Sequence, residues 1–201
     1  MSRISDLRKQ EILDAAVTCF SKQGFHQTSI DDICRAVQMS PGSVYRYFRS
    51  KNDIIRAMVE AEQEQSIQLI HLISEQDDLV TGLKHIIKQA LTTLNNPRRH
   101  ALNAEITAEA FRNKAVAKMV DQSFEVTVAA LAEAIRQEQS KKTIDTTLHP
   151  VLTAELIIAL FDGLWWRQAI RPDTSPTRHA KSLTKIIERL LQPVKKPIKR
   201  K

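Results

Sequence analysis

Apolar residues recur along most of this chain at intervals of three and four positions, which is the spacing of one face of an α-helix. The clearest stripe consists of Ile30, Ile33, Cys34 and Val37, which fall at i, i+3, i+4 and i+7. No segment alternates apolar and polar residues as a half-buried strand would, and the chain contains only four glycines. The pattern therefore predicts an all-α protein.

Two helices are predicted before the first tight turn. The first covers about residues 5–23, and Gly24 follows at the position where helices often end in a left-handed residue. The second begins near Thr28, and Asp31 three positions later gives the pattern of a capping box with a shorter acid. A turn at residues 38–39 is expected to end this second helix.

The third predicted helix, within residues 40–51, has few apolar positions with which to bury itself. Ser40 is a good N-cap, and Pro41 suits the first helical position because its missing N–H would be unpaired there anyway. Val44 and Phe48 lie one turn apart and are expected to point inward. The side chains expected to be largely exposed are Gly42, Ser43, Tyr45, Arg46, Tyr47 and Arg49.

Two short helices joined by a tight turn, of which the second displays polar and aromatic groups, form the pattern of a helix-turn-helix. A helix fits the major groove of DNA, roughly 12 Å wide, and reads base edges with its exposed face. Gly42 lets the backbone approach closely, while Ser43 and Tyr45 reach base edges or phosphates. Tyr47 offers a hydroxyl and Lys51 a point charge to phosphate. The alternative is a surface helix of a small bundle, which the preceding capped helix and the short turn disfavour.

Longer helices are predicted over the rest of the chain. The first of them covers about residues 52–75, and its apolar stripe thins in the run EAEQEQSIQ. The others are expected at residues 78–95, 98–111, 113–140 and 150–171, with a last helix between Ser175-Pro176 and Pro193.

Composition changes this picture little. Of the 201 residues, 42% are hydrophobic and 26% are charged, which is ordinary for a folded soluble protein. The net charge is +7, but five cations after Pro193 leave the body of the chain only 7 − 5 = +2. Overall charge is therefore weak evidence for nucleic-acid binding, and residues 193–201 are expected to form a basic, disordered tail.

The remaining chemistry excludes several classes of protein. Cys19 and Cys34 fall within apolar helical patterns and are expected to be reduced core residues. The N-terminus lacks the apolar run of a signal peptide, and no apolar stretch approaches membrane-spanning length, so we expect a cytoplasmic protein without a membrane partner. The six histidines are scattered, and no zinc-ligand spacing or nucleophile motif occurs. Neither an enzyme nor a metal or cofactor site is expected.

The stretch TSIDDICRAVQMSPGSVYRYFRSK, residues 28–51, resembles the DNA-binding motif of TetR-type bacterial transcriptional regulators. The resemblance covers residues 8–60 and rests on Thr28, Ser29, Ser40, Gly42, Tyr45, Tyr47, Phe48 and Lys51. Asp31 departs from it, since some members carry a cation there, and we interpret this acid as a helix cap. The resemblance implies DNA contacts from Thr28, Ser29, Pro41, Gly42, Ser43, Tyr45, Arg46, Tyr47 and Lys51.

The resemblance further implies a larger helical domain that dimerises through its last two helices and often encloses a ligand pocket. Residues 1–52 would then be the DNA-binding domain, and residues 53–192 the effector-binding and dimerisation domain. The stretch LFDGLWWRQAI, residues 160–170, also resembles a helix of the choline-responsive repressor branch. The protein is therefore expected to be a homodimeric repressor that leaves a palindromic operator on double-stranded DNA when a small-molecule effector binds.

Two alternatives stay open on the sequence alone. A protein of the same fold could bind DNA without a small-molecule effector, acting architecturally or under the control of a protein partner. The second alternative is a helical binding protein whose basic tail contacts acidic surfaces.

Two apolar stripes near the C-terminus are candidates for the dimer interface. Ala159 and Gly163 are small enough to let another helix approach closely, and the last helix carries a continuous apolar stripe. The predicted interface consists of Ala159, Gly163, Trp166, Leu183, Ile187 and Leu190. The alternative is that both stripes belong to the core of a single chain.

A candidate ligand pocket combines aromatic and acidic residues, namely Glu105, Glu109, Phe111, Phe124, Phe161, Asp162 and Trp165. Acids set among alanines and aromatics could hold a cationic ligand through charge and cation–π contacts. Alternatively, the aromatic residues are core residues, and Glu105 and Glu109 face solvent or pair with neighbouring arginines.

Overall fold

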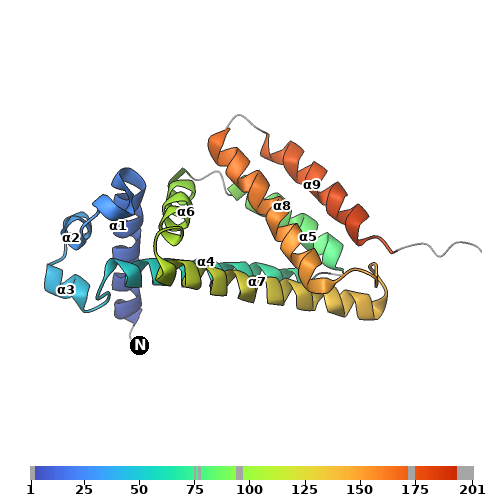
Figure 1. Ribbon diagram of the computed structural model, residues 1–201, viewed down its shortest axis with the longest axis horizontal. Helices are drawn as coiled ribbons and strands as arrows, with labels where there is room; N and C mark the ends of the chain where they lie inside the picture. Colours follow the sequence, from blue (N-terminus) through green and yellow to red (C-terminus); the bar gives the residue numbers. More distant parts are fainter. Residues whose placement is uncertain (1–2, 75, 77, 94–96, 172–174, 194–201) are drawn as a thin grey trace, which may run out of the picture. The chain divides into compact units, whose positions relative to one another are not determined.

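The computed structural model describes residues 3–74, 76, 78–93, 97–171 and 175–193. Every regular element within these residues is an α-helix, so the all-α prediction is confirmed (Figure 1). In chain order these helices are α1 (Arg3–Gln27), α2 (Ile30–Val37), α3 (Pro41–Tyr45), α4 (Lys51–Ser74), α5 (Leu79–Thr93), α6 (Pro97–Ala110), α7 (Lys114–Lys141), α8 (Pro150–Ile170) and α9 (Pro176–Leu191). Within the described ranges, no helix has the length and the apolar run that crossing a bilayer requires. The predicted basic tail lies outside the described residues, apart from Pro193.

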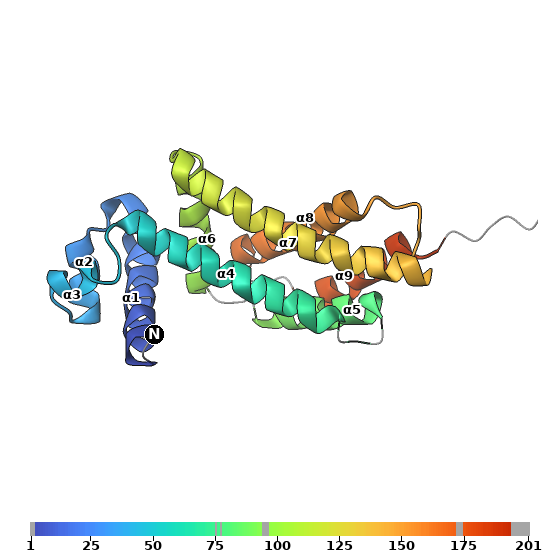
Figure 2. The ribbon, with the colours of Figure 1, turned by 90° about the horizontal axis from the view of Figure 1, so that it is seen from below.

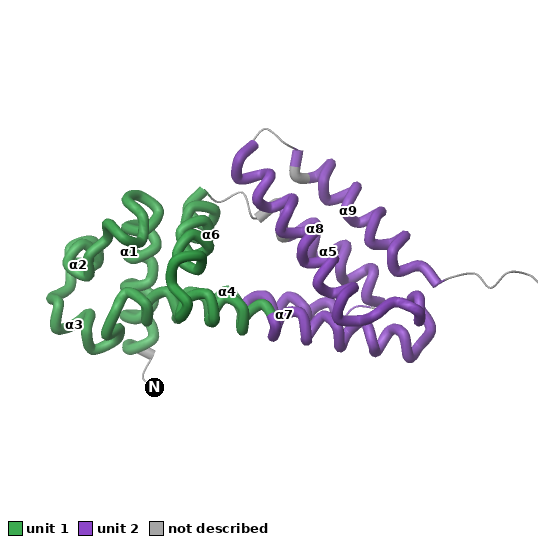
Figure 3. The backbone as a smooth tube through the Cα atoms, in the orientation of Figure 1, with its two compact units in different colours: residues 1–64, 96–124 green, residues 65–95, 125–201 purple. Residues whose placement is uncertain are grey.

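The helices form two compact units, which Figure 3 colours separately. Unit 1 comprises residues 1–64 and 96–124, and unit 2 comprises residues 65–95 and 125–201. One division falls inside α4, where the apolar pattern of the sequence thins, and another falls inside α7. Unit 1 therefore contains more than residues 1–52, because α6 and the beginning of α7 contribute to the same core.

The core of unit 1 is built around α1. Ile12, Ala16 and Phe20 of this helix are buried together with apolar residues of α2, α3 and α4. Leu102 and Ile106 bring α6 into the same core, and α6 packs along α1. The short helices α2 and α3 thus rest on a scaffold that includes a segment distant in the sequence.

Near its end α1 contains a backbone break at Gly24, whose φ of 81° lies in the left-handed region, as the sequence predicted. The capping box of α2 is shifted by one residue from the predicted pair, Thr28 and Asp31. Asp32 N–H donates to Ser29 Oγ at 3.1 Å, and Ser29 N–H donates to Asp32 Oδ2 at 2.8 Å. Thr28 cannot cap the helix because it is buried and its hydroxyl donates to the Gly24 carbonyl at 2.8 Å.

The helix α3 is short and firmly anchored. Ser40 caps it, with its Oγ accepting the Ser43 N–H at 3.3 Å. Val44 and Phe48 are 0% and 2% exposed, which confirms the two predicted anchors. The helix itself ends three residues before Phe48, and a turn leads on to α4.

In unit 2, α9 packs along α5 and touches α8 (Figure 2). The core draws on α5, α7, α8 and α9, with Ile135, Leu183 and Ile187 among its most buried residues. The helix α5 also approaches the end of α4 very closely. A Cβ added at Gly82 would lie 2.7–2.8 Å from atoms of Ile73, two of which are backbone atoms, so this crossing requires glycine.

Candidate functional site

The face of α3 that the sequence assigned to DNA is open in unit 1. Its exposed residues are Pro41, Gly42, Tyr45 and Arg46, and its half-buried residues are Ser43 and Tyr47. The Tyr45 residue keeps 49% of its surface accessible. A Cβ added at Gly42 would meet no atom of the described chain within 4 Å, so the backbone itself is accessible there. The two inward anchors therefore present one continuous polar and aromatic face to the outside.

The two residues predicted to contact DNA at the beginning of α2 are both engaged within the protein. Thr28 is only 1% exposed, so its side chain is enclosed behind the beginning of α2. Ser29 is exposed, but its hydroxyl donates to Asp32 Oδ2 at 2.6 Å. The Ser29 hydroxyl, followed by the Ser29 N–H, lowers the pKa of Asp32 to about 2, so this acid stays charged at neutral pH. A phosphate beside Ser29 would therefore meet a negative charge.

Lys51, which the sequence assigned to a phosphate contact, has partners within unit 1. Its Nζ donates to the Phe25 carbonyl at 2.7 Å and to the His26 carbonyl at 3.4 Å. The same Nζ lies 4.4 Å from the centre of the Phe25 ring. Partial burial lowers the pKa of Lys51, and the charge of Glu109 opposes this change. Lys51 therefore ties the first residue of α4 to the end of α1.

Glu105 and Glu109, which the sequence placed in a ligand pocket, bind the same end of α1. Glu105 Oε2 accepts the Phe25 N–H at 3.0 Å. Glu109 is 3% exposed, and its Oε2 lies 2.9 Å from His26 Nε2, an ion pair whenever the imidazole is protonated. Its Oε1 accepts from Asn113 Nδ2 at 3.1 Å. Both acids therefore hold α6 against the segment that leads into the helix-turn-helix.

The aromatic residues predicted for the pocket do not come together. Phe111 is 87% exposed directly after α6, and Phe124 is 39% exposed on α7. Trp165 is buried on α8 and stacks edge-to-face on Trp166, with ring centres 5.1 Å apart. Of the seven predicted residues, only Phe161 and Asp162 line the cavity of unit 2.

This cavity, which we call the unit 2 cavity, has a volume of about 190 Å³ and lies among α4, α5, α7, α8 and α9. Fourteen residues line it, and eleven of them are isoleucine, leucine or phenylalanine. The three polar lining residues are Ser66, Thr127 and Asp162. Because one buried water needs only about 10–15 Å³, the cavity has room for a small organic molecule.

Asp162 provides the charge of the unit 2 cavity. Much of its surface is accessible to solvent, yet the apolar atoms around the carboxyl displace water, and this desolvation raises its pKa to about 6. No hydrogen bond or ion pair from the described residues reaches the carboxylate, and desolvation is the one cause of the raised pKa. At neutral pH the Asp162 carboxylate is therefore ionised and has no partner among the described residues.

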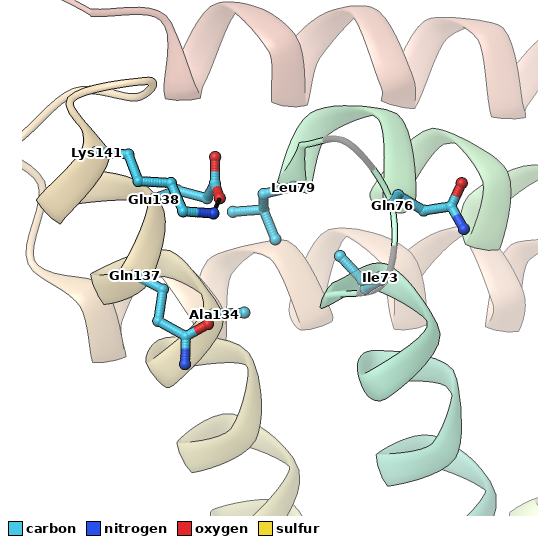
Figure 4. Close-up of a pocket in the computed structure, with 7 residues that line it drawn as sticks. All are labelled: Ile73, Gln76, Leu79, Ala134, Gln137, Glu138 and Lys141. Carbon is cyan, nitrogen blue, oxygen red and sulfur yellow. Dashed lines mark hydrogen bonds and ion pairs between the residues drawn. The ribbon is translucent and has the colours of Figure 1, made fainter.

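A second opening in unit 2, shown in Figure 4, is much smaller. It has a volume of about 20 Å³, and its lining includes Ile73 of α4 together with Glu138 and Lys141 of α7. Lys141 Nζ donates to Glu138 Oε1 at 2.7 Å (Figure 4). Burial raises the pKa of Glu138, but hydrogen bonds from Lys141 and Thr143 outweigh this effect and lower it. This opening has room for only one or two waters, and its acid is already paired, so it is not a ligand site.

An apolar surface on α8 and α9 is left uncovered by the described chain. Leu152, Leu156 and Leu160 of α8 are 40–58% exposed, and Ile186 of α9 is 52% exposed. A Cβ added at Gly163, on the same helix α8, would meet no described atom within 4 Å. We call these four large side chains and Gly163 the α8–α9 face.

The six residues predicted for a dimer interface differ in how far they are exposed in unit 2. Ala159 and Gly163 are exposed, and Trp166 and Leu190 are half-buried. Leu183 and Ile187 are 2% and 1% exposed because they pack inside unit 2, so they are not available to a second chain. Leu152 and Leu160 were not predicted for the interface, although they lie four residues before and after Leu156 and continue its helical stripe.

No group of three or more His, Cys, Asp or Glu side chains among the described residues is placed to hold a metal ion. Both cysteines are free, with Cys34 buried and Cys19 half-buried. Burial, followed by the charge of Asp31, raises the pKa of the Cys34 thiol and keeps it protonated.

Comparison with known proteins agrees with this architecture. Residues 12–58 match the family described as bacterial regulatory proteins, tetR family, and residues 80–192 match the BetI-type transcriptional repressor C-terminal domain. The HTH-type transcriptional regulator UidR of Escherichia coli strain K12 is 30% identical over 163 residues, which cover 78% of this chain and 79% of UidR.

Solved structures share the whole fold. GusR of Salmonella enterica matches with a TM-score of 0.79 and 29% identity, over 92% of this chain and 95% of GusR. FadR of Bacillus subtilis, solved in complex with stearoyl-CoA, matches with a TM-score of 0.79 and 17% identity, over 89% of this chain and 96% of FadR. With its open α3 face and both family domains, this chain belongs to the TetR family of helix-turn-helix transcriptional regulators, which are not enzymes, and carries a BetI-type C-terminal domain.

Proposed function

We propose that this chain is a homodimeric repressor that binds a palindromic operator and is released from it by a small molecule. The observation that carries the proposal is the α3 face, where two buried anchors and a serine cap hold a short helix with its polar side outward. DNA contacts are assigned to Pro41, Gly42, Ser43, Tyr45, Arg46 and Tyr47. Thr28, Ser29 and Lys51 are assigned to positioning, because each is already bonded within unit 1.

The short length of α3 supports binding as a dimer. A helix of five residues spans about 7.5 Å, so one copy reads too few base pairs for useful specificity. Two copies related by two-fold symmetry place their recognition helices one DNA turn apart, roughly 34–36 Å. The α8–α9 face is assigned to the contact between copies, since two helices from each chain form a four-helix interface that covers its exposed leucines.

The continuity of α4 supports control by a ligand. Ile54 and Ile55, near its beginning, are buried in the core of unit 1, and Ile70 and Ile73, near its end, line the unit 2 cavity. Suppose that a ligand prefers an arrangement of this helix that does not fit the operator. It then weakens DNA binding by the difference between its affinities for that arrangement and for the DNA-binding one, commonly ~1–3 kcal/mol. By reciprocity, operator DNA weakens ligand binding by the same factor.

Selection of bound sequences from a random DNA pool tests the proposal directly. The expected product is a two-fold symmetric sequence, bound by one dimer. A variant that ends at Pro193 serves as the control for the basic tail and is expected to select the same sequence with weaker overall affinity. Enrichment of no sequence, or loss of all sequence preference in the shortened variant, would contradict recognition through α3.

A further inference from the structure

The unit 2 cavity offers a ligand mainly hydrocarbon surface. Ile70 of α4, Ile87 of α5, Leu131 of α7 and Ile157 of α8 line it from four helices, so apolar contacts are available on several sides. A strongly hydrated ligand would exchange its water for hydrocarbon, which costs free energy unless every polar group finds a partner. The body of a ligand that fills this cavity is therefore apolar.

The single charge of the lining determines the sign of the ligand's own charge. Asp162 is the only ionisable side chain among the described residues that line the cavity, and no cation of those residues pairs with it. An anionic ligand in the cavity would place a second negative charge beside this carboxylate, and the two charges would repel each other. A cation would instead supply the missing partner, and the ring of Phe161, in the same lining, adds an aromatic surface that attracts cations.

We propose that the unit 2 cavity binds a monocation with a bulky apolar body, such as a hydrophobic amine, whose ammonium group pairs with Asp162. Small hydrated cations bind poorly because they leave the apolar lining uncovered. Carboxylates and acyl-CoA thioesters are excluded by their negative charge, so the ligand class differs from the stearoyl-CoA bound in FadR of Bacillus subtilis. The inference that this cation is the effector rests on the proposed control by a small molecule.

Calorimetric titration of the full chain without DNA tests the ligand class. Phenylbutylamine, phenylbutanol and phenylbutyrate share one apolar body and differ in charge, and tetramethylammonium is a cation without that body. Phenylbutylamine is expected to bind at least about tenfold more tightly than phenylbutanol, with no measurable binding of phenylbutyrate or tetramethylammonium. Equal or tighter binding of the alcohol or the acid, or failure of the amine to bind, would overturn the inference.

Variants on α8 test whether the preference for the amine over the alcohol comes from the Asp162 carboxylate. Asp162→Asn is expected to reduce the roughly tenfold preference for the amine to less than about twofold while leaving the affinity for the alcohol unchanged. Glu155→Gln removes an acid from the same helix that does not line the cavity, so it is expected to keep the full preference. A preference that survives in Asp162→Asn would overturn the assignment. Ile158→Trp adds volume at the lining and is expected to weaken the amine and the alcohol together, which locates both in the cavity.

Operator binding separates this inference from the proposed function. If phenylbutylamine binds as expected but leaves operator affinity unchanged, the ligand class stands and the proposed effector control is wrong. If the protein selects a symmetric operator but binds no amine, the repressor proposal stands and the ligand class is wrong.

Discussion

Replacing Lys51 by methionine tests whether this side chain positions the helix-turn-helix or contacts DNA. Methionine keeps most of the apolar stem and removes the ammonium group, so the hydrogen bond to the Phe25 carbonyl at 2.7 Å and the ring contact at 4.4 Å are lost. A hydrogen bond with a charged partner contributes about 1.5–3 kcal/mol, and a cation–π contact at an exposed site about 0.5–1 kcal/mol. Because Lys51 is partly open to solvent, the free energy of unfolding is expected to fall by about 2 kcal/mol, near the lower end of the sum.

Two measurements on the same variant separate the two roles. Urea unfolding measures the loss of stability, and the salt dependence of operator binding counts phosphate contacts, since each lost contact reduces the slope of log K against log salt by about 0.9. Lys51→Met is expected to leave this slope unchanged. Arg46→Met, at the exposed C-cap of α3, is the matched control and is expected to reduce the slope by about 0.9 in each half-site while changing stability by less than about 0.5 kcal/mol. A Lys51→Met protein of unchanged stability and reduced slope would refute positioning and support the phosphate contact that the sequence indicated.

Four further substitutions test the other assignments. Tyr45→Ala is expected to weaken binding to the selected operator by ~1–3 kcal/mol and to random DNA much less; an equal loss on both would assign Tyr45 to phosphate. Gly82→Ala is expected to lower the free energy of unfolding by about 1–3 kcal/mol, because its Cβ would lie 2.8 Å from backbone atoms of Ile73. An unchanged urea midpoint would show that these helices can separate. Gly163→Arg is expected to give a folded monomer in sedimentation, since a Cβ there meets no described atom of its own chain within 4 Å; a dimeric variant would place the interface elsewhere. The pKa of Asp162 is raised from 3.8 to about 6 in the folded chain, so the folded state holds this proton more tightly and ionisation destabilises it. Relative to Asp162→Asn, the unfolding free energy of the wild type is therefore expected to fall by about 1 kcal/mol between about pH 4 and about pH 7, after allowance for solvent screening. A difference between the two proteins that does not vary with pH would contradict the raised pKa.

The helix-turn-helix could be predicted from sequence because its signals are local. Ser40 as a cap and the inward pair Val44 and Phe48 depend on neighbours within two turns, and the structure confirms all three. The capping box of α2 was misplaced for a reason that local sequence cannot resolve. Thr28 and Ser29 are both hydroxyl residues with an aspartate three positions later, so both frames fit equally well. Burial of Thr28 against the Gly24 carbonyl, a contact set by how α1 ends, selects the second frame.

The cavity and the α8–α9 face were predicted less well, because periodicity shows that a stripe is apolar but not what covers it. Leu183 and Ile187 form as regular a pattern as the exposed leucines of α8, yet α9 turns its own stripe into the core of unit 2. Ile186, one position away, is the large apolar residue of α9 that the described chain leaves exposed. Only packing between helices distant in the sequence decides which of two neighbouring positions is free for a second chain.

The contacts around the end of α1 show what such long-range packing adds. Three charged side chains, Glu105 and Glu109 from α6 and Lys51 from α4, converge on Phe25 and His26 directly after the left-handed break of α1. The break leaves main-chain groups of this segment without helical partners, and Glu105 accepts the free Phe25 N–H while Lys51 donates to the carbonyl of the same residue. The first helix of the helix-turn-helix, α2, begins at Ile30, four residues after His26. Its position in unit 1 is therefore fixed by α4 and α6 through these bonds as well as by the apolar core. Any movement of α6 along α1 must break a charged contact or carry the beginning of α2 with it.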